Sequence, residues 1–383
     1  MQRTKQLNAW FSYDSPVNIP DSPVMTVPFL FTQETGREEV GKIREQINAA
    51  PFYPGSDSAI EENRQFRYVV FAPAGTSRFS KAIIMLHGLN ERSWSKYLVW
   101  AEDLVLNCGI PVILFPIAFH MNRTPAGWYT PRWLQPWLNR RKQEIKNLVN
   151  ASFANLALSS RLTISPLRFY SSGLESAFNL NQLVRDIKQG KHPLFAEDAG
   201  VDFFAYSIGA LLSQVVMMAD VDGYLKESRL FAFCGGAVFE RMNGNARDII
   251  DQEAYNAIHS YYLKDFLNHT FFEDNREKSP GLLLETAFKN MIPSSDITGK
   301  RQIFFAGAKD RIKMISLKQD LVIPTVGLQE AVGQELSEHM LEELDFSYPY
   351  SHQTPFPENG KISDNEIRES FRAVFDRAAS FLV

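Results

Sequence analysis

The sequence predicts an α/β protein with a mostly parallel central sheet and helices on both faces. Short, continuous apolar segments such as residues 81–86 and 201–206 are typical of strands that are buried on both sides. Segments with apolar residues at helical spacing lie between them, and this alternation favours a parallel sheet with helical crossovers. With 383 residues, 45% of them hydrophobic, the chain can bury one large core.

The predicted strands are apolar segments that end at turn-forming residues. The segment at 67–72 ends before Pro73 and Gly75, and the segment at 81–86 ends at His87 and Gly88. The segment at 111–115 ends at Pro116. The complete set of predicted strands is residues 67–72, 81–86, 111–115, 201–206, 229–233, 301–305 and 344–348.

The predicted helices carry apolar residues three and four positions apart. Gly109 follows the helix expected at 93–106, as a glycine at a helix C-terminus commonly does. Residues 208–218 are nearly all apolar, which indicates a helix buried on most sides. The predicted helices with this pattern are residues 93–106, 174–188, 208–218 and 366–381, and a further helix-like segment lies at 335–343.

The chain is predicted to have one principal domain with an extension and two insertions. Residues 1–66 are rich in Pro, Asp and Ser and form the expected N-terminal extension, with room for one short helix at 41–50. Residues 67–383 form the principal domain. Two helix-rich stretches at about 119–172 and 239–295 do not fit the alternation. Both follow the carboxyl ends of predicted strands, so we expect them to form a cap over that edge of the sheet.

Composition excludes several classes of function. A net charge of −4 does not favour a nucleic-acid partner. Cys108 and Cys234 do not form a C-x-x-C spacing. We interpret both as small buried apolar side chains of a protein in a reducing compartment. The chain contains no apolar segment of membrane-spanning length, and its first residues lack the apolar core of a signal peptide, so we expect a cytoplasmic protein. Metal-ligand clusters and Gly-rich phosphate loops are also absent, and no cofactor or metal is expected.

The most informative motif is a serine between a strand and a helix. The sequence Ala205-Tyr206-Ser207-Ile208-Gly209 joins the strand expected at 201–206 to the apolar helix at 208–218. Small residues two positions before and after the serine allow a sharp turn that lifts its hydroxyl clear of the sheet. The alternative interpretation is a serine that caps the helix.

A nucleophilic serine needs a histidine base and a carboxylate that orients the base. His352 lies in the loop between the last predicted strand and the closing helix, and we assign it as the base. Asp310 follows the strand expected at 301–305 and is the predicted acid, with Glu240 as the competing candidate. His339 lies among charged residues of a predicted helix and is interpreted as solvated.

An oxyanion hole requires two fixed N–H donors. We expect them to be the backbone N–H groups of Ile208, directly after the serine, and of Leu89, in the turn after the strand at 81–86. Five residues near these turns or in the first insertion are expected to line the substrate site: His87, Gly88, His120, Trp128 and Tyr206. The alternative for His120 is a structural role. The alternative for Trp128 is packing in the core of the cap.

Together these residues resemble the α/β-hydrolase superfamily. The order Ser207, Asp310, His352 along the chain is the nucleophile–acid–histidine order of that superfamily, and residues 205–209 resemble its nucleophile elbow. His87-Gly88 resembles its oxyanion loop. The resemblance covers roughly residues 67–383 apart from the two insertions. It implies a serine hydrolase that cleaves a carboxylic ester or related acyl bond of a small-molecule substrate through an acyl-enzyme.

Two other functions remain open at the level of the sequence. An acyltransferase would use the same residues if the cap excluded water and admitted an alcohol or amine acceptor. A non-catalytic binding protein could also keep the fold, because fold does not determine function.

Overall fold

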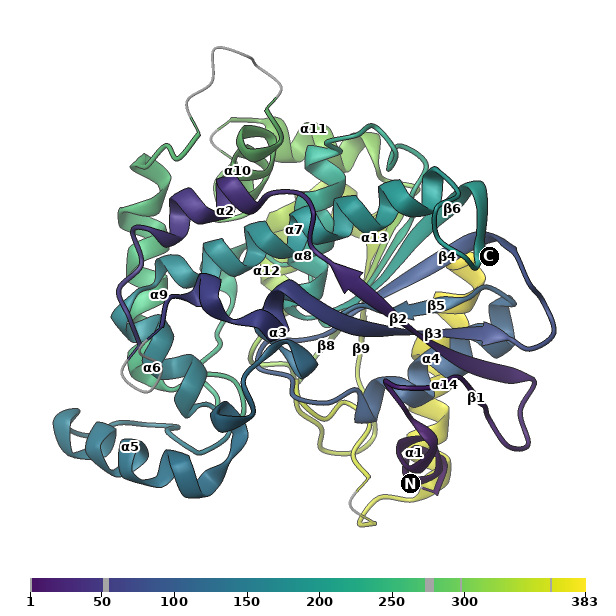
Figure 1. Ribbon diagram of the computed structural model, residues 1–383, viewed down its shortest axis with the longest axis horizontal. Helices are drawn as coiled ribbons and strands as arrows, with labels where there is room; N and C mark the ends of the chain where they lie inside the picture. Colours follow the sequence, from purple (N-terminus) through teal and green to yellow (C-terminus); the bar gives the residue numbers. More distant parts are fainter. Residues whose placement is uncertain (1, 51–54, 273–278, 297, 359) are drawn as a thin grey trace.

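A computed structural model describes residues 2–50, 55–272, 279–296, 298–358 and 360–383, and Figure 1 shows its layers. In this part of the chain a nine-stranded sheet has the order β1-β2-β3-β5-β4-β6-β7-β8-β9. From β5 to β9 every neighbouring pair is parallel, whereas β3 pairs antiparallel with both β2 and β5. The strands are β1 (Val17–Asn18), β2 (Val24–Thr32), β3 (Gln65–Pro73), β4 (Phe79–Leu86), β5 (Val112–Leu114), β6 (Phe195–Tyr206), β7 (Leu230–Phe233), β8 (Ile312–Leu317) and β9 (Leu341–Leu344).

Helices cover both faces of this sheet, which confirms the predicted α/β class with a mostly parallel central sheet. Along β4 the side chains alternate: Ile83 and Met85 pack in the core that includes α4 and α14, whereas Ile84 packs in the core that includes α7 and α8. Both faces are therefore apolar, as a parallel sheet between two helical layers requires. The helices are α1 (Gln2–Trp10), α2 (Arg37–Arg44), α3 (Glu61–Arg64), α4 (Ser95–Cys108), α5 (Pro131–Glu144), α6 (Leu156–Ile164), α7 (Leu167–Lys188), α8 (Ile208–Ala219), α9 (Gln252–Lys264), α10 (Pro280–Asn290), α11 (Lys300–Gly307), α12 (Thr325–Val332), α13 (Gln334–Met340) and α14 (Asp364–Leu382).

The N-terminal segment contributes more structure than expected. Strand β2 pairs with the whole length of β3, from Val24 opposite Pro73 to Thr32 opposite Gln65. Pro28 weakened the strand pattern in the sequence, because proline cannot donate to a sheet ladder. The short β1 pairs only with Thr26 and Met25, so Pro28 lies on an open edge where no donor is needed. The helix expected at 41–50 begins and ends earlier, as α2 (Arg37–Arg44).

Two predicted strands near the C-terminus were wrong. Residues 301–305 lie in α11, where Arg301 and Phe305 are buried four positions apart and Ile303 between them is 72% exposed. A short apolar run fits either structure, and here the helical spacing decides. The strand of this region is β8 (Ile312–Leu317), which follows α11. The last strand, β9, ends at Leu344, where the predicted one began.

The two predicted insertions contact each other beside the sheet. Helix α6 from the first packs against α9 from the second, and Arg141 of α5 pairs with Asp251, the N-cap of α9, at 2.7 Å. Helix α10 packs on α8, the helix that follows Ser207. Whether they act as a separate cap remains a prediction.

None of the described helices is long and apolar enough to cross a membrane.

Candidate active site

Ser207 occupies a strained turn between β6 and α8. Its φ of 56° and ψ of −122° lie in a region that residues other than glycine rarely adopt. Close backbone approach makes this turn possible. A Cβ on Gly209 would lie 2.9 Å from the His87 carbonyl oxygen, and a Cβ on Gly235 would lie 2.6 Å from the Ser207 carbonyl oxygen. The sequence motif indicated Gly209 but not Gly235, which comes from the loop after the neighbouring strand β7.

His352 lies against Ser207 from the loop between β9 and α14. Its Nε2 is 2.7 Å from Ser207 Oγ, and the histidine is 4% exposed. Tyr206 holds this loop, because its hydroxyl donates to the His352 carbonyl oxygen and its ring stacks on the imidazole at 5.3 Å between centroids. The loop residue assigned as the base is therefore within hydrogen-bond reach of the serine.

The carboxylate beside His352 belongs to Asp320. Its Oδ2 is 2.7 Å from His352 Nδ1, and its side chain is fully buried. The other oxygen, Oδ1, accepts hydrogen bonds from the N–H groups of Val322 and Ile323, each at 2.9 Å. These contacts fix the carboxylate beside Nδ1. In the tautomer that carries its proton on Nδ1, the imidazole donates to Asp320 and Nε2 can accept from the serine.

The predicted acid, Asp310, lies elsewhere. Its carboxylate is exposed and faces His339 Nε2 at 3.0 Å, at the start of β8. The error follows from the misassigned strand: Asp310 precedes β8, whereas Asp320 follows it and so lies at the carboxyl edge of the sheet. The run Ile312–Leu317, ending before Asp320, is the signal that would have found it. Glu240 is also separate from His352, since it accepts from the Ser294 N–H at 2.6 Å.

The turn after β4 approaches Ser207 closely. The Gly88 N–H donates to the Tyr97 hydroxyl at 2.9 Å, and a Cβ on Gly88 would lie 3.4 Å from Ser207 Cβ. Leu89 and Ile208 both line a cavity that also touches Ser207. This places the two expected donor residues on the same side of the serine.

Of the residues predicted to line the substrate site, some face the space around Ser207 and others do not. Gly88 and Tyr206 line the cleft that opens at Ser207 and His352, and His120 lines a neighbouring apolar cavity. His87 is fully buried: its Nδ1 donates to the Gly88 carbonyl oxygen at 2.8 Å, and its Nε2 accepts from the Ile117 N–H at 2.9 Å. It therefore holds the turn rather than facing a substrate. Burial also lowers the pKa of His87 well below its usual value, which keeps the imidazole neutral.

Trp128 packs inside the first insertion. It is 5% exposed, and the Arg161 guanidinium lies 4.1 Å from its ring centroid. These surroundings agree with the alternative interpretation of Trp128, which is packing in the core of the insertion.

A polar cleft lies on one side of Ser207 and apolar cavities lie on the other. On the His352 side, a cleft of about 280 Å³ is lined by polar residues that include Asn90, Glu91 and Lys96. On the other side, behind Ser207 and Leu89, lie two apolar cavities of about 40 and 50 Å³. In the described part of the chain no group of three or more His, Cys, Asp or Glu is arranged to hold a metal ion.

The comparisons with known proteins identify one family and a set of distant structures. The model described as "Family of unknown function (DUF6051)" matches residues 37–383. None of the curated proteins matches the chain.

Similar solved structures include a variant of the esterase rPPE in complex with (S)-Ac-CPA (10% identity, TM-score 0.44, covering 99% of this chain and 88% of that one). Carboxyl esterase 2 of the fungus Tuber melanosporum is also similar (9% identity, TM-score 0.42, 99% and 96%). A third is a thermostable esterase from Pseudomonas putida ECU1011 (11% identity, TM-score 0.38, 99% and 85%). At these values no activity is transferred to this chain.

Proposed function

We propose that this chain, which belongs to the family of unknown function DUF6051, is a serine hydrolase that cleaves a carboxylic ester or related acyl bond. The observation that carries the proposal is the continuous contact from Ser207 Oγ to His352 Nε2, and from His352 Nδ1 to Asp320, with 2.7 Å at each step. A helix-capping role for Ser207 does not account for a buried histidine and a buried carboxylate aligned behind its hydroxyl.

In the proposed reaction, Ser207 Oγ attacks the ester carbonyl while His352 Nε2 takes its proton. The bond from the acyl carbon to the leaving oxygen then breaks, and His352 returns the proton to the departing alcohol. Water attacks the acyl-enzyme in the same way and releases the acid. Asp320 orients His352 and stabilises the imidazolium in both steps.

The oxyanion is assigned to the N–H groups of Leu89 and Ile208. Ile208 is the first residue of α8, a helix of 12 residues whose N-terminus carries a partial positive charge. A negative oxygen that develops beside Ser207 is stabilised there by fixed donors that need not reorganise.

A fluorophosphonate probe tests the proposal, because it reacts with serines that a histidine activates. We expect the wild type to be labelled, and both Ser207→Ala and His352→Ala to lose labelling while remaining folded by circular dichroism. Ser93→Ala is the matched control, since Ser93 lines the same cleft but is exposed and should not affect labelling. Folded wild type that resists labelling, or labelling that persists in Ser207→Ala, would refute the proposal.

A further inference from the structure

Four arginines are buried together beside the candidate active site. We call them the arginine cluster: Arg44, Arg123, Arg161 and Arg168, with exposed fractions of 8, 0, 3 and 4%. They lie among α2, α6, α7 and the loop after β5. Burying a guanidinium is costly unless an opposite charge or hydrogen bonds replace its water.

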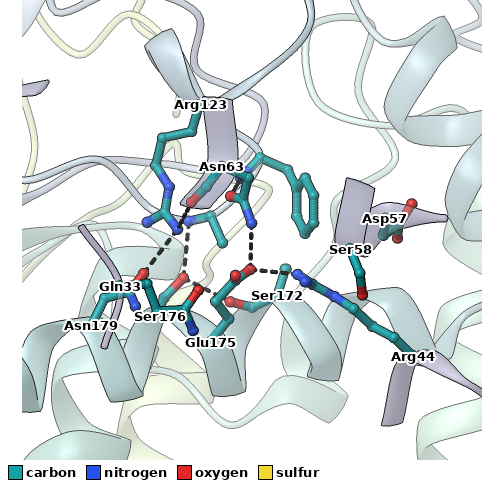
Figure 2. Close-up of polar contacts among 12 residues, drawn as sticks. Gln33, Arg44, Asp57, Ser58, Asn63, Arg123, Ser172, Glu175, Ser176 and Asn179 are labelled. Carbon is teal, nitrogen blue, oxygen red and sulfur yellow. Dashed lines mark hydrogen bonds and ion pairs between the residues drawn. The ribbon is translucent and has the colours of Figure 1, made fainter. Parts of the chain in front are cut away.

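The carboxylates facing this cluster are too few to neutralise it. Figure 2 shows Arg44 and Asn63 directed at Glu175, and Arg123 directed at Asn179, which carries no charge. Asp57 pairs with the other two arginines of the cluster, at 2.9 Å to each. Among the described residues, four guanidinium charges therefore face two carboxylates, and two positive charges are left over.

Three arginines of the cluster have unused hydrogen-bonding capacity, because the Nε atoms of Arg44, Arg123 and Arg161 lack a hydrogen-bond partner among the described residues. Of these three, Arg161 lines a cavity near the candidate active site. Its Nε has no partner among the described residues, and its guanidinium packs over the rings of Phe119 and Trp128, at 4.8 and 4.1 Å from the centroids. Arg168 is held firmly, because it donates to Asp57, to the Arg161 carbonyl oxygen and to the Asn48 carbonyl oxygen. Burial lowers the pKa of Arg161 to about 10, so it stays charged at neutral pH.

A small cavity beside this charge shares lining residues with the cavities at the candidate active site. Arg161 and Arg168 line it together with His120 and Ser172, and it shares Leu89 and Phe169 with both apolar cavities behind Ser207. These three cavities, of about 40, 50 and 20 Å³, hold roughly seven to eleven water-sized groups. That is the size of a short acyl chain with a polar end group.

The position of His352 decides which part of the substrate enters these cavities. His352 must reach the leaving oxygen, and it lines the polar cleft but none of the three cavities. The alcohol of the ester therefore occupies the cleft, and the acyl group lies on the opposite side.

We propose that the substrate is a half-ester of a dicarboxylic acid, whose acyl chain runs from Ser207 through the apolar cavities and ends in a carboxylate bound by Arg161 and Arg168. This inference rests on the proposed hydrolase function. Carboxylates match the planar donor arrangement of arginine, and one here would offset part of the excess charge.

The test compares matched pairs of aryl esters. One member is the half-ester of adipic, pimelic or suberic acid, and the other carries a primary amide in place of the terminal carboxylate, equal in size but neutral. We expect the wild type to prefer the carboxylate at least about tenfold in kcat/KM, the usual effect of a charged hydrogen bond. Arg161→Gln should lose the preference. Arg301→Gln, which removes a buried arginine in α11, should retain it.

A second measurement uses only the wild-type protein, so it tests the inference even if Arg161→Gln does not fold. Free adipate should inhibit wild-type hydrolysis of the amide ester competitively, and hexanoate should inhibit it at least about tenfold more weakly. Equal or faster hydrolysis of the amide at every length would overturn this inference alone. If neither ester is cleaved and the fluorophosphonate does not label Ser207, the proposed hydrolase function fails, and the inference fails with it.

Discussion

At the scale of single residues, the site depends on how each polar atom of Asp320 and His352 is satisfied. The carboxylate accepts two backbone N–H groups on Oδ1 and the imidazole on Oδ2. Three contacts on one buried carboxylate hold it in a single orientation. Its role in the proposed reaction is therefore to keep the His352 ring oriented, with Nδ1 facing Asp320, throughout turnover.

The first residue-scale prediction separates the two candidate acids. Asp320→Asn keeps the shape but can no longer hold the proton on Nδ1, so we expect kcat/KM for an activated ester to fall about 10²- to 10⁴-fold. Asp310→Asn is the control and should stay within about twofold of wild type, because Asp310 is exposed and contacts only His339 among its described polar partners. The reverse pattern would return the role to Asp310.

At the scale of elements, the serine turn requires β7 to pass very close to the β6–α8 junction. Gly235 follows β7, and a Cβ there would lie 2.6 Å from the Ser207 carbonyl oxygen and 2.7 Å from Ala210 Cβ. Ala210 belongs to α8 and Gly235 follows the end of β7 by two residues, so neither side can move away without disturbing the helix or the end of the strand.

Gly235→Ala should therefore lower both stability and activity. We expect the free energy of unfolding to fall by about 1–3 kcal/mol, the usual cost of overpacking, with loss of the Ser207 geometry and of fluorophosphonate labelling. Gly41→Ala is the control: Gly41 lies in α2 with open space around its Cβ position, and alanine there should be neutral or slightly stabilising. Urea denaturation measures the free energy of unfolding of both variants. Equal stability of the two variants would contradict the prediction.

At the scale of the whole molecule, several histidines are buried as neutral imidazoles. Burial lowers the pKa of His120 to about 4 and that of His192 to about 4. His120 supports the loop after β5 through its contact with the Ala118 carbonyl oxygen, and His192 packs on Phe29 of β2 at 4.7 Å between centroids. Protonation of either would leave a charge inside the core.

Stability should consequently fall as the pH is lowered. The folded pKa lies below the unfolded value of 6.5, so the unfolded chain binds more protons between about pH 6.5 and 4, and the stabilisation present above pH 6.5 is lost across that window. By pH 5 the loss is about 2 kcal/mol per histidine. Urea unfolding at pH 7.5 and 5 measures it. His192→Phe should reduce the pH dependence, whereas His339→Gln, at an exposed site, should leave it unchanged.

Local patterns in the sequence were sufficient to predict the turn at Ser207 and the central strands. The apolar run before Ser207, the small residues around it and the apolar helix after it together specify a strand, a sharp turn and a helix. The central strands β3, β4 and β6 were predicted for the same reason, because burial on both faces leaves a continuous apolar run. His352 was found by its place after the last strand, although that strand ends earlier than predicted.

Tertiary structure alone decided the features that depend on pairing between distant segments. An apolar run such as Ile303-Phe304-Phe305 suits a helix or a strand, and only packing showed that the next run, β8, enters the sheet and carries Asp320 rather than Asp310 to its carboxyl edge. Pro28 interrupts the strand pattern of residues 24–32, and the pairing of β2 with β3 is what shows that these residues form a strand. The excess charge of the arginine cluster is likewise a property of the fold, because Arg44, Arg123 and Arg161 are far apart in sequence and meet only when α2, α6 and the loop after β5 converge on α7.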